Sequence, residues 1–143
     1  MHVLIALERD EDGYPPVDAE ELDAVDLGGG RFELVSAPAF AYGIAPGDVL
    51  RAEEREDGIW AVEVVCSSAN WLARVIPRAG ASTAPAAAEF GRLGCITRES
   101  PFGLVTVVVP PKVPALPILR RLYEGQDDSE EWYFDLGVAP ELG

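Results

Sequence analysis

Apolar and polar residues alternate over short stretches in the first half of the chain, and polar turns separate those stretches. HVLIALE predicts a strand, and two hairpins are predicted to turn at the triple glycine of residues 28–30 and at REDG, because glycine tolerates the positive φ angles of tight reversals. Ahead of them, VDAEELDA predicts a short helix, since Asp18 is a good N-cap and Glu21 follows as in a capping box. Closely spaced strands with polar turns indicate a small antiparallel barrel.

The pattern changes after residue 69. WLARVIP, CITRES, GLVTVVV and EWYFDLGV each predict a strand, whereas STAPAAAEFGRLG and VPALPILRRLYEG predict helices. The order is β-α-β-β-α-β, the split βαβ or ferredoxin-like arrangement, whose central strands would be the very apolar WLARVI and GLVTVVV. The sequence therefore predicts an α+β protein, with a β-barrel-like subdomain at residues 1–69 and a ferredoxin-like subdomain at residues 70–143.

The charge of the chain is strongly negative. Its 143 residues include 25 acidic and 11 basic side chains, which gives a formal net charge of -14. Such a field repels nucleic acids and anionic membrane surfaces, and no cluster of Lys and Arg offsets it. The longest apolar run contains prolines and a lysine, and the N-terminus lacks the basic region of a signal peptide. We therefore expect a cytoplasmic protein that contacts neither nucleic acid directly nor a membrane.

Residues that support common enzymatic chemistry are scarce. His2 is the one histidine, and Cys66 and Cys95 are far apart and outside any CxxC pattern. These residues predict neither a zinc site nor a nucleophilic triad, and we expect both thiols to be reduced. No phosphate-binding glycine motif is found, so we predict no cofactor and no metal. A catalytic pair among the carboxylates is the remaining enzymatic alternative, and it ranks last.

One candidate binding segment combines acidic and aromatic residues. The run DDSEE leads directly into WYFDL. Exposed aromatic rings supply contact area, while carboxylates steer an oppositely charged partner into place. The segment therefore predicts a contact surface for a protein partner with a basic surface, formed by Asp127, Asp128, Glu130, Glu131 and Trp132.

The loop FAYGIAPGDVL is the second candidate. In a structural interpretation, Phe40 and Ile44 fill the end of the barrel and Tyr42 buries its ring. Asp48 then accepts backbone N–H bonds at the start of the next strand. In a functional interpretation, Tyr42 lines a groove between the two halves that binds a small ligand or peptide. The residues assigned to that groove are Phe40, Tyr42, Asp48, Asn70, Trp71 and Arg74.

Two motifs carry a family resemblance. At DEDGYPPVDAEEL and APAFAYGIAPGDVLRAEE, the chain resembles a family of small bacterial proteins known as a domain of unknown function, over roughly residues 3–76. The resemblance implies a family and no activity. The residues themselves predict a non-enzymatic acidic binding protein, such as an immunity-type inhibitor or regulator of a basic protein. The alternatives are an accessory module that binds a small ligand or peptide, and a carboxylate-dependent enzyme.

Overall fold

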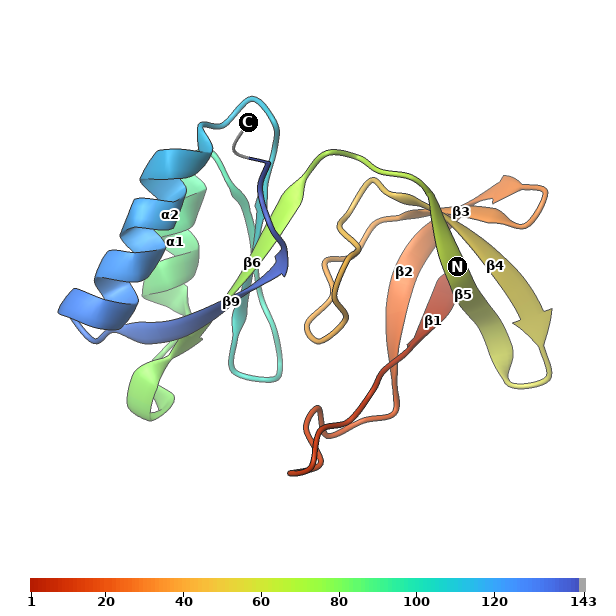
Figure 1. Ribbon diagram of the computed structural model, residues 1–143, viewed down its shortest axis with the longest axis horizontal. Helices are drawn as coiled ribbons and strands as arrows, with labels where there is room; N and C mark the ends of the chain where they lie inside the picture. Colours follow the sequence, from red (N-terminus) through yellow and green to blue (C-terminus); the bar gives the residue numbers. More distant parts are fainter. Residues whose placement is uncertain (142–143) are drawn as a thin grey trace. The chain divides into compact units, whose positions relative to one another are not determined.

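The computed structural model describes residues 1–141, which form two compact units. The first unit is Met1–Ser68 and the second begins at Ala69. Both are built mainly from antiparallel β-sheet, and the helices α1 and α2 belong to the second unit (Figure 1). The predicted α+β class is confirmed at this level. Within residues 1–141, no helix has the length and apolar composition needed to cross a membrane.

The first unit is a five-stranded sheet that closes on itself. Its strands pair in the order β1-β2-β3-β4-β5, and a parallel pair between Leu4 and Trp60 joins β1 back to β5. The longest connections are the first long loop, residues 7–18, and the second long loop, residues 35–48. The strands are β1 (His2–Ala6), β2 (Ala19–Gly28), β3 (Arg31–Leu34), β4 (Val49–Arg55) and β5 (Gly58–Cys66).

The segment predicted as a short helix is instead the beginning of β2. Glu20, Leu22 and Ala24 are buried in the strand. Glu21 is exposed, as the alternation of a strand requires. The capping box at Asp18 and Glu21 is therefore a wrong prediction. The period of two was hidden because a carboxylate, Glu20, occupies an inward position that is apolar in most strands.

Both predicted hairpins of this unit are present. Gly28, Gly29 and Gly30 have φ values of 83°, 66° and 79°, in the left-handed region that glycine tolerates. They make the reversal between β2 and β3, while the second hairpin joins β4 to β5. The buried core inside the closed sheet includes Val3, Leu22, Phe32, Leu34 and Leu50.

The second unit is a four-stranded antiparallel sheet with its two helices on one face (Figure 1). The strand order is β7-β8-β6-β9. The central strands β6 and β8 are almost entirely buried, which explains why they are so apolar in the sequence. The elements are β6 (Trp71–Pro77), α1 (Ala84–Arg92), β7 (Ile96–Glu99), β8 (Val105–Val109), α2 (Ala115–Tyr123) and β9 (Trp132–Val138), with helical turns at Arg78–Gly80 and Glu124–Asp128.

Candidate functional site

A buried carboxylate holds the beginning of the FAYGI segment. Glu20 Oε2 accepts the backbone N–H of Ala39 at 2.5 Å, and Oε1 accepts those of Phe40 and Ala41 at 3.1 and 3.0 Å. Buried backbone donors need acceptors, and an ionised carboxylate is a strong one. Three donors of the second long loop are therefore satisfied by one side chain of β2. This explains why an acidic residue faces inward at that position.

Asp48 fixes the far end of the same loop. It is buried, and its Oδ2 accepts the N–H of Ala45 at 2.9 Å. Its Oδ1 accepts the N–H of Ser68 at 2.8 Å. The predicted hydrogen bonding of Asp48 to the backbone is confirmed. Between the two carboxylates, the chain turns at Gly43 and Gly47, whose φ values are 83° and 90°.

Tyr42 is the exposed aromatic residue of this loop. Phe40 and Ile44 are buried, as the structural interpretation predicts, but 65% of Tyr42 is exposed. The prediction that Tyr42 buries its ring is therefore wrong. The hydrogen bonds of Glu20 end at Ala41 and the chain reverses just after Tyr42, which leaves its side chain on the outside of the turn.

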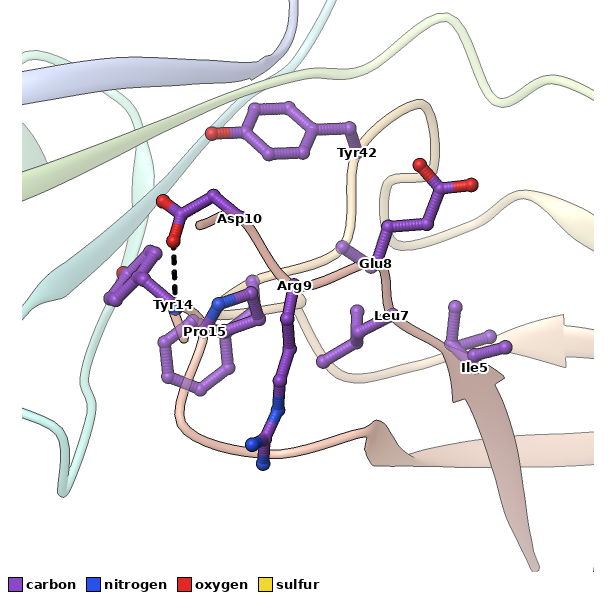
Figure 2. A pocket seen from close by; sticks show the side chains of 11 residues that line it. Ile5, Leu7, Glu8, Arg9, Asp10, Tyr14, Pro15 and Tyr42 are labelled. Carbon is purple, nitrogen blue, oxygen red and sulfur yellow. Dashed lines mark hydrogen bonds between the residues drawn. The ribbon is translucent and has the colours of Figure 1, made fainter. Parts of the chain in front are cut away.

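Tyr42 lines a pocket of about 630 Å³ that is formed entirely by residues of the first unit. One wall comes from the end of β1 and the first long loop, and the other from residues 40–42. Ile5 and Leu7 (Figure 2), together with Phe40, form an apolar part of the lining. A volume in this range is typical of ligand sites in proteins.

The first long loop is folded around Asp10. Oδ1 of Asp10 accepts the backbone N–H groups of Asp12 and Tyr14, both at 2.9 Å, as an Asx turn does. The backbone N–H of Asp10 is in turn donated to the carbonyl of Tyr14. Tyr14 packs edge-on against Phe40, with ring centroids 5.8 Å apart, and precedes a cis peptide bond to Pro15. The two long loops therefore meet at an aromatic contact beside the pocket.

The charged residues of the pocket differ in their bonding. The guanidinium of Arg9 donates to the carbonyl of Pro16 at 2.8 Å and lies 3.1 Å from Oδ1 of Asp18, so it extends away from the two tyrosines (Figure 2). In contrast, the carboxylate of Glu8 and Oδ2 of Asp10 accept no hydrogen bond from residues 1–141. Two carboxylates therefore line the pocket: that of Asp10 lies between the side chains of Tyr14 and Tyr42, whereas that of Glu8 points away from Asp10 (Figure 2).

The residues predicted for a groove belong to different units: Phe40, Tyr42 and Asp48 to the first, and Asn70, Trp71 and Arg74 to the second. In the second unit, Trp71 is buried in the core beneath the helices, and Asn70 is half-buried. Arg74 of β6 is only 2% exposed, and its Nε donates to Oδ1 of Asp135 in β9 at 2.8 Å. Trp71 is therefore a core residue. The ion pair between Arg74 and Asp135 joins two neighbouring strands of the sheet.

The acidic-aromatic segment does not present Trp132 to solvent. Trp132 is 3% exposed, and its ring lies 5.6 Å from that of Phe90. Its Nε1–H donates to the carbonyl of Leu122 at 3.0 Å. The expectation that this aromatic ring is exposed is wrong, because the alternation of β9 places Trp132 inward and Tyr133 outward.

The acidic residues of that segment have different environments. Glu131 accepts hydrogen bonds from the Ser129 hydroxyl at 2.5 Å and from Arg121 Nη2 at 2.8 Å. The Ser129 hydroxyl, and secondly Arg121, lower the pKa of Glu131. Glu131 is therefore engaged within the unit. The three remaining acidic residues predicted here are exposed: Asp127, Asp128 and Glu130.

The negative charge is distributed unequally. Residues 1–68 contain 16 acidic and 4 basic side chains, whereas the rest of the chain contains 9 and 7. The formal charge is thus -12 on the first unit and -2 on the remainder. Within residues 1–141, no group of His, Cys, Asp and Glu is arranged to hold a metal ion.

These features describe a two-unit α+β protein with an acidic first unit. The chain belongs to the family described as a domain of unknown function (DUF4265), whose model matches residues 20–133. The family resemblance predicted from the sequence is confirmed. No curated protein matches the chain.

One solved structure shows a closely similar fold. It is described as a novel crystal structure of a hypothetical protein from Neisseria gonorrhoeae. The match has a TM-score of 0.81 and 14% sequence identity, and it covers 98% of this chain and 95% of that chain. At this identity, the likeness extends to the fold alone.

Proposed function

We propose that this protein is a non-enzymatic acidic binding protein whose first unit contacts a basic surface of a protein partner. The observation that best supports the proposal is the unequal charge, with a formal -12 on residues 1–68. A field of one sign concentrated on one unit accelerates association with an oppositely charged partner and disfavours like-charged ones. An immunity-type inhibitor or a regulator of a basic cytoplasmic protein fits this charge distribution.

The contact surface that we propose is the first long loop, in place of the acidic-aromatic segment predicted from the sequence. Trp132 is buried and Glu131 is bonded to Arg121 and Ser129, so neither is available without rearrangement. Glu8, Glu11 and Asp12 are exposed and lie close together in sequence, beside the tyrosine-lined pocket. Aromatic rings next to carboxylates are the combination expected at a contact with a basic surface.

We also propose a specific fold for each of the two units. The closed strand order of the first unit supports its assignment as a small β-barrel. The order β7-β8-β6-β9, with both helices on one face, supports a ferredoxin-like second unit. Neither assignment specifies an activity, since such folds host many unrelated functions.

The experiment is a pull-down of a basic partner at low and high salt with two matched variants. The first carries Glu8→Gln, Glu11→Gln and Asp12→Asn in the first unit. The second removes the same number of charges from the second unit through Asp127→Asn, Asp128→Asn and Glu130→Gln. We expect one stoichiometric basic protein with the native chain and with the second variant, and salt-sensitive loss of that protein with the first.

Two results would contradict the proposal. Capture that persists unchanged at high salt would indicate an apolar interface in place of charge steering. Loss of the partner with the second variant but not the first would move the contact to the DDSEE segment. Thermal unfolding of both variants serves as the control, since exposed charge changes of this kind shift stability by only about 0.5 kcal/mol each.

A second candidate function is an accessory module that binds a small ligand or peptide. It is favoured by the pocket of about 630 Å³ in the first unit. Saturable thermal stabilisation by one class of metabolite, together with a pull-down that captures no basic protein, would favour this alternative.

A further inference from the structure

We propose that the pocket beside Tyr14 and Tyr42 receives an arginine side chain of the basic partner. The inference rests on the proposed function, and it specifies the chemistry by which one partner residue is recognised. The pocket combines the three features that such a side chain requires: an apolar wall, aromatic ring faces and carboxylates.

The apolar wall suits the stem of an arginine. Ile5, Leu7 and Phe40 line the pocket, and the methylene groups of arginine lie favourably along such a surface while the charged head stays near polar groups. The pocket volume of about 630 Å³ leaves room for the side chain and for part of its backbone. The pocket is therefore large enough for a residue of a polypeptide, and it is larger than a small inorganic cation needs.

The two tyrosines provide ring faces for a guanidinium. Tyr42 is 65% exposed and Tyr14 is 52% exposed, and both line the same pocket. A guanidinium stacks on aromatic faces through cation–π attraction, and it is more weakly hydrated than an ammonium group. The same protein already uses this contact elsewhere, since Cζ of Arg78 lies 4.0 Å from the ring centroid of Tyr133.

The carboxylates provide the charge. Glu8 and Oδ2 of Asp10 line the pocket and accept no hydrogen bond from the described residues, 1–141. Arg9, the pocket's own cation, is bonded to Asp18 and Pro16 and forms no ion pair with Glu8 or Asp10. A guanidinium carries five N–H donors in a planar fork, which matches the geometry of a carboxylate such as that of Asp10. Figure 2 shows Asp10 between the two tyrosine side chains.

The site is organised before any partner arrives. Asp10 is held by the N–H groups of Asp12 and Tyr14, and the loop that carries Phe40 and Tyr42 is held by Glu20. Because these bonds are made in the unbound protein, binding loses less conformational entropy.

The test is a titration of the full chain with acetyl-Gly-Arg-Gly-amide, followed by chemical shifts of backbone amides. The same peptide with citrulline in place of arginine is the control, since citrulline keeps the shape and removes the charge. We expect saturable shifts confined to residues 5–15 and 39–43 with the arginine peptide, and none with the citrulline peptide. A lysine peptide should bind more weakly, because an ammonium group is better hydrated and cannot form the planar fork.

Variants locate the interaction within the pocket. Tyr42→Ala should weaken binding about two- to thirtyfold, the range of a cation–π contact. Glu8→Gln combined with Asp10→Asn should weaken it by about the same factor, as expected for two partly exposed charge pairs. The asparagine retains the carbonyl acceptor for the turn. Glu56→Gln removes one charge from the same unit away from the pocket, and it should leave the affinity unchanged.

Three outcomes overturn the inference: equal shifts with the citrulline peptide, tighter binding of the lysine peptide, or shifts that spread outside the pocket. Its failure is distinguishable from failure of the proposed function. Capture of a basic partner without any peptide-induced shift refutes the arginine site alone. Saturable arginine-peptide binding without a captured partner refutes the proposed function and leaves a guanidinium site.

Discussion

Replacement of Glu20 is the most direct test of how this structure is held together. Its carboxylate accepts three backbone N–H groups, from Ala39, Phe40 and Ala41. In Glu20→Gln, one carbonyl oxygen remains for two of these donors, but the amide NH₂ must face the third. In Glu20→Ala, all three donors lose their acceptor. The pair of variants therefore separates the loss of one hydrogen bond from the loss of the whole arrangement.

The expected magnitudes follow from the cost of a buried polar group without a partner. One unsatisfied buried donor costs about 1–3 kcal/mol, so we expect Glu20→Gln to lower the free energy of unfolding by that amount. Glu20→Ala should cost about 3–5 kcal/mol, since the loop can relax and recover part of the loss from water. At roughly 0.05–0.15 kcal/mol per residue, the whole first unit has about 3–10 kcal/mol, so the alanine variant can unfold it. The glutamine variant is therefore the more informative.

Urea unfolding should be followed by amide signals of the first unit, because the tryptophans Trp71 and Trp132 of the second unit contribute to total fluorescence. Hydrogen exchange at residues 39–41 provides a local readout, and these amides should exchange faster in the glutamine variant. Glu33→Gln on the exposed side of β3 is the matched control, with an expected change within about 0.5 kcal/mol. The reasoning is refuted if Glu20→Gln is as stable as the native chain, or if residues 39–41 already exchange as fast as the exposed turn at Gly29.

Two further predictions concern the second unit and the thiols. Gly125→Ala should destabilise the second unit by about 1–3 kcal/mol in urea unfolding, because a Cβ there would lie 2.1 Å from Cε2 of Trp132. Gly91→Ala in α1 is the control: its Cβ would lie 3.7 Å from Oγ1 of Thr97, so this variant should be neutral or stabilising. Equal losses of stability in the two variants would contradict the packing argument. Iodoacetamide at neutral pH should label the exposed Cys66 and spare Cys95, because burial raises the pKa of Cys95 to about 11. Equal labelling of both thiols by mass spectrometry would refute the predicted protection of Cys95. Since the folded pKa of Cys95 lies above the unfolded value of about 8.5, its contribution to stability is complete below about pH 8.5 and is lost toward about pH 11.

Much of the fold could be predicted from local patterns. The glycines at residues 28–30 and the apolar run of β8 predict a hairpin and a buried strand, because turn geometry and two-sided burial leave a direct mark on composition. The hydrogen bonding of Asp48 to the backbone was also predicted correctly, since its acceptor role at Ala45 lies within three residues of the chain. The family resemblance stated from the sequence was also correct, since the family model matches residues 20–133.

The candidate site was predicted only in part. Tyr42 was singled out, but its partners in the pocket, Glu8, Asp10 and Tyr14, were not. Those residues lie about 30 residues earlier in the chain, in a run of charges that resembles an ordinary solvated turn. The sequence contains one signal for them, the acidic run beside Tyr14, but it does not indicate which distant loop shares their pocket.

The sequence by itself determined the order of strands and helices in the second unit, the positions of the hairpin turns, the strong negative charge and the scarcity of catalytic side chains, because these depend on composition and local periodicity. Only the tertiary structure decided which face of each element is buried. In the folded chain, Glu20 faces inward and accepts backbone N–H groups 19 to 21 residues away. Tyr42 is exposed to solvent, and Trp132 is buried in the core. These outcomes depend on strand register and on bonds between distant residues, and a shift of one residue would reverse every face.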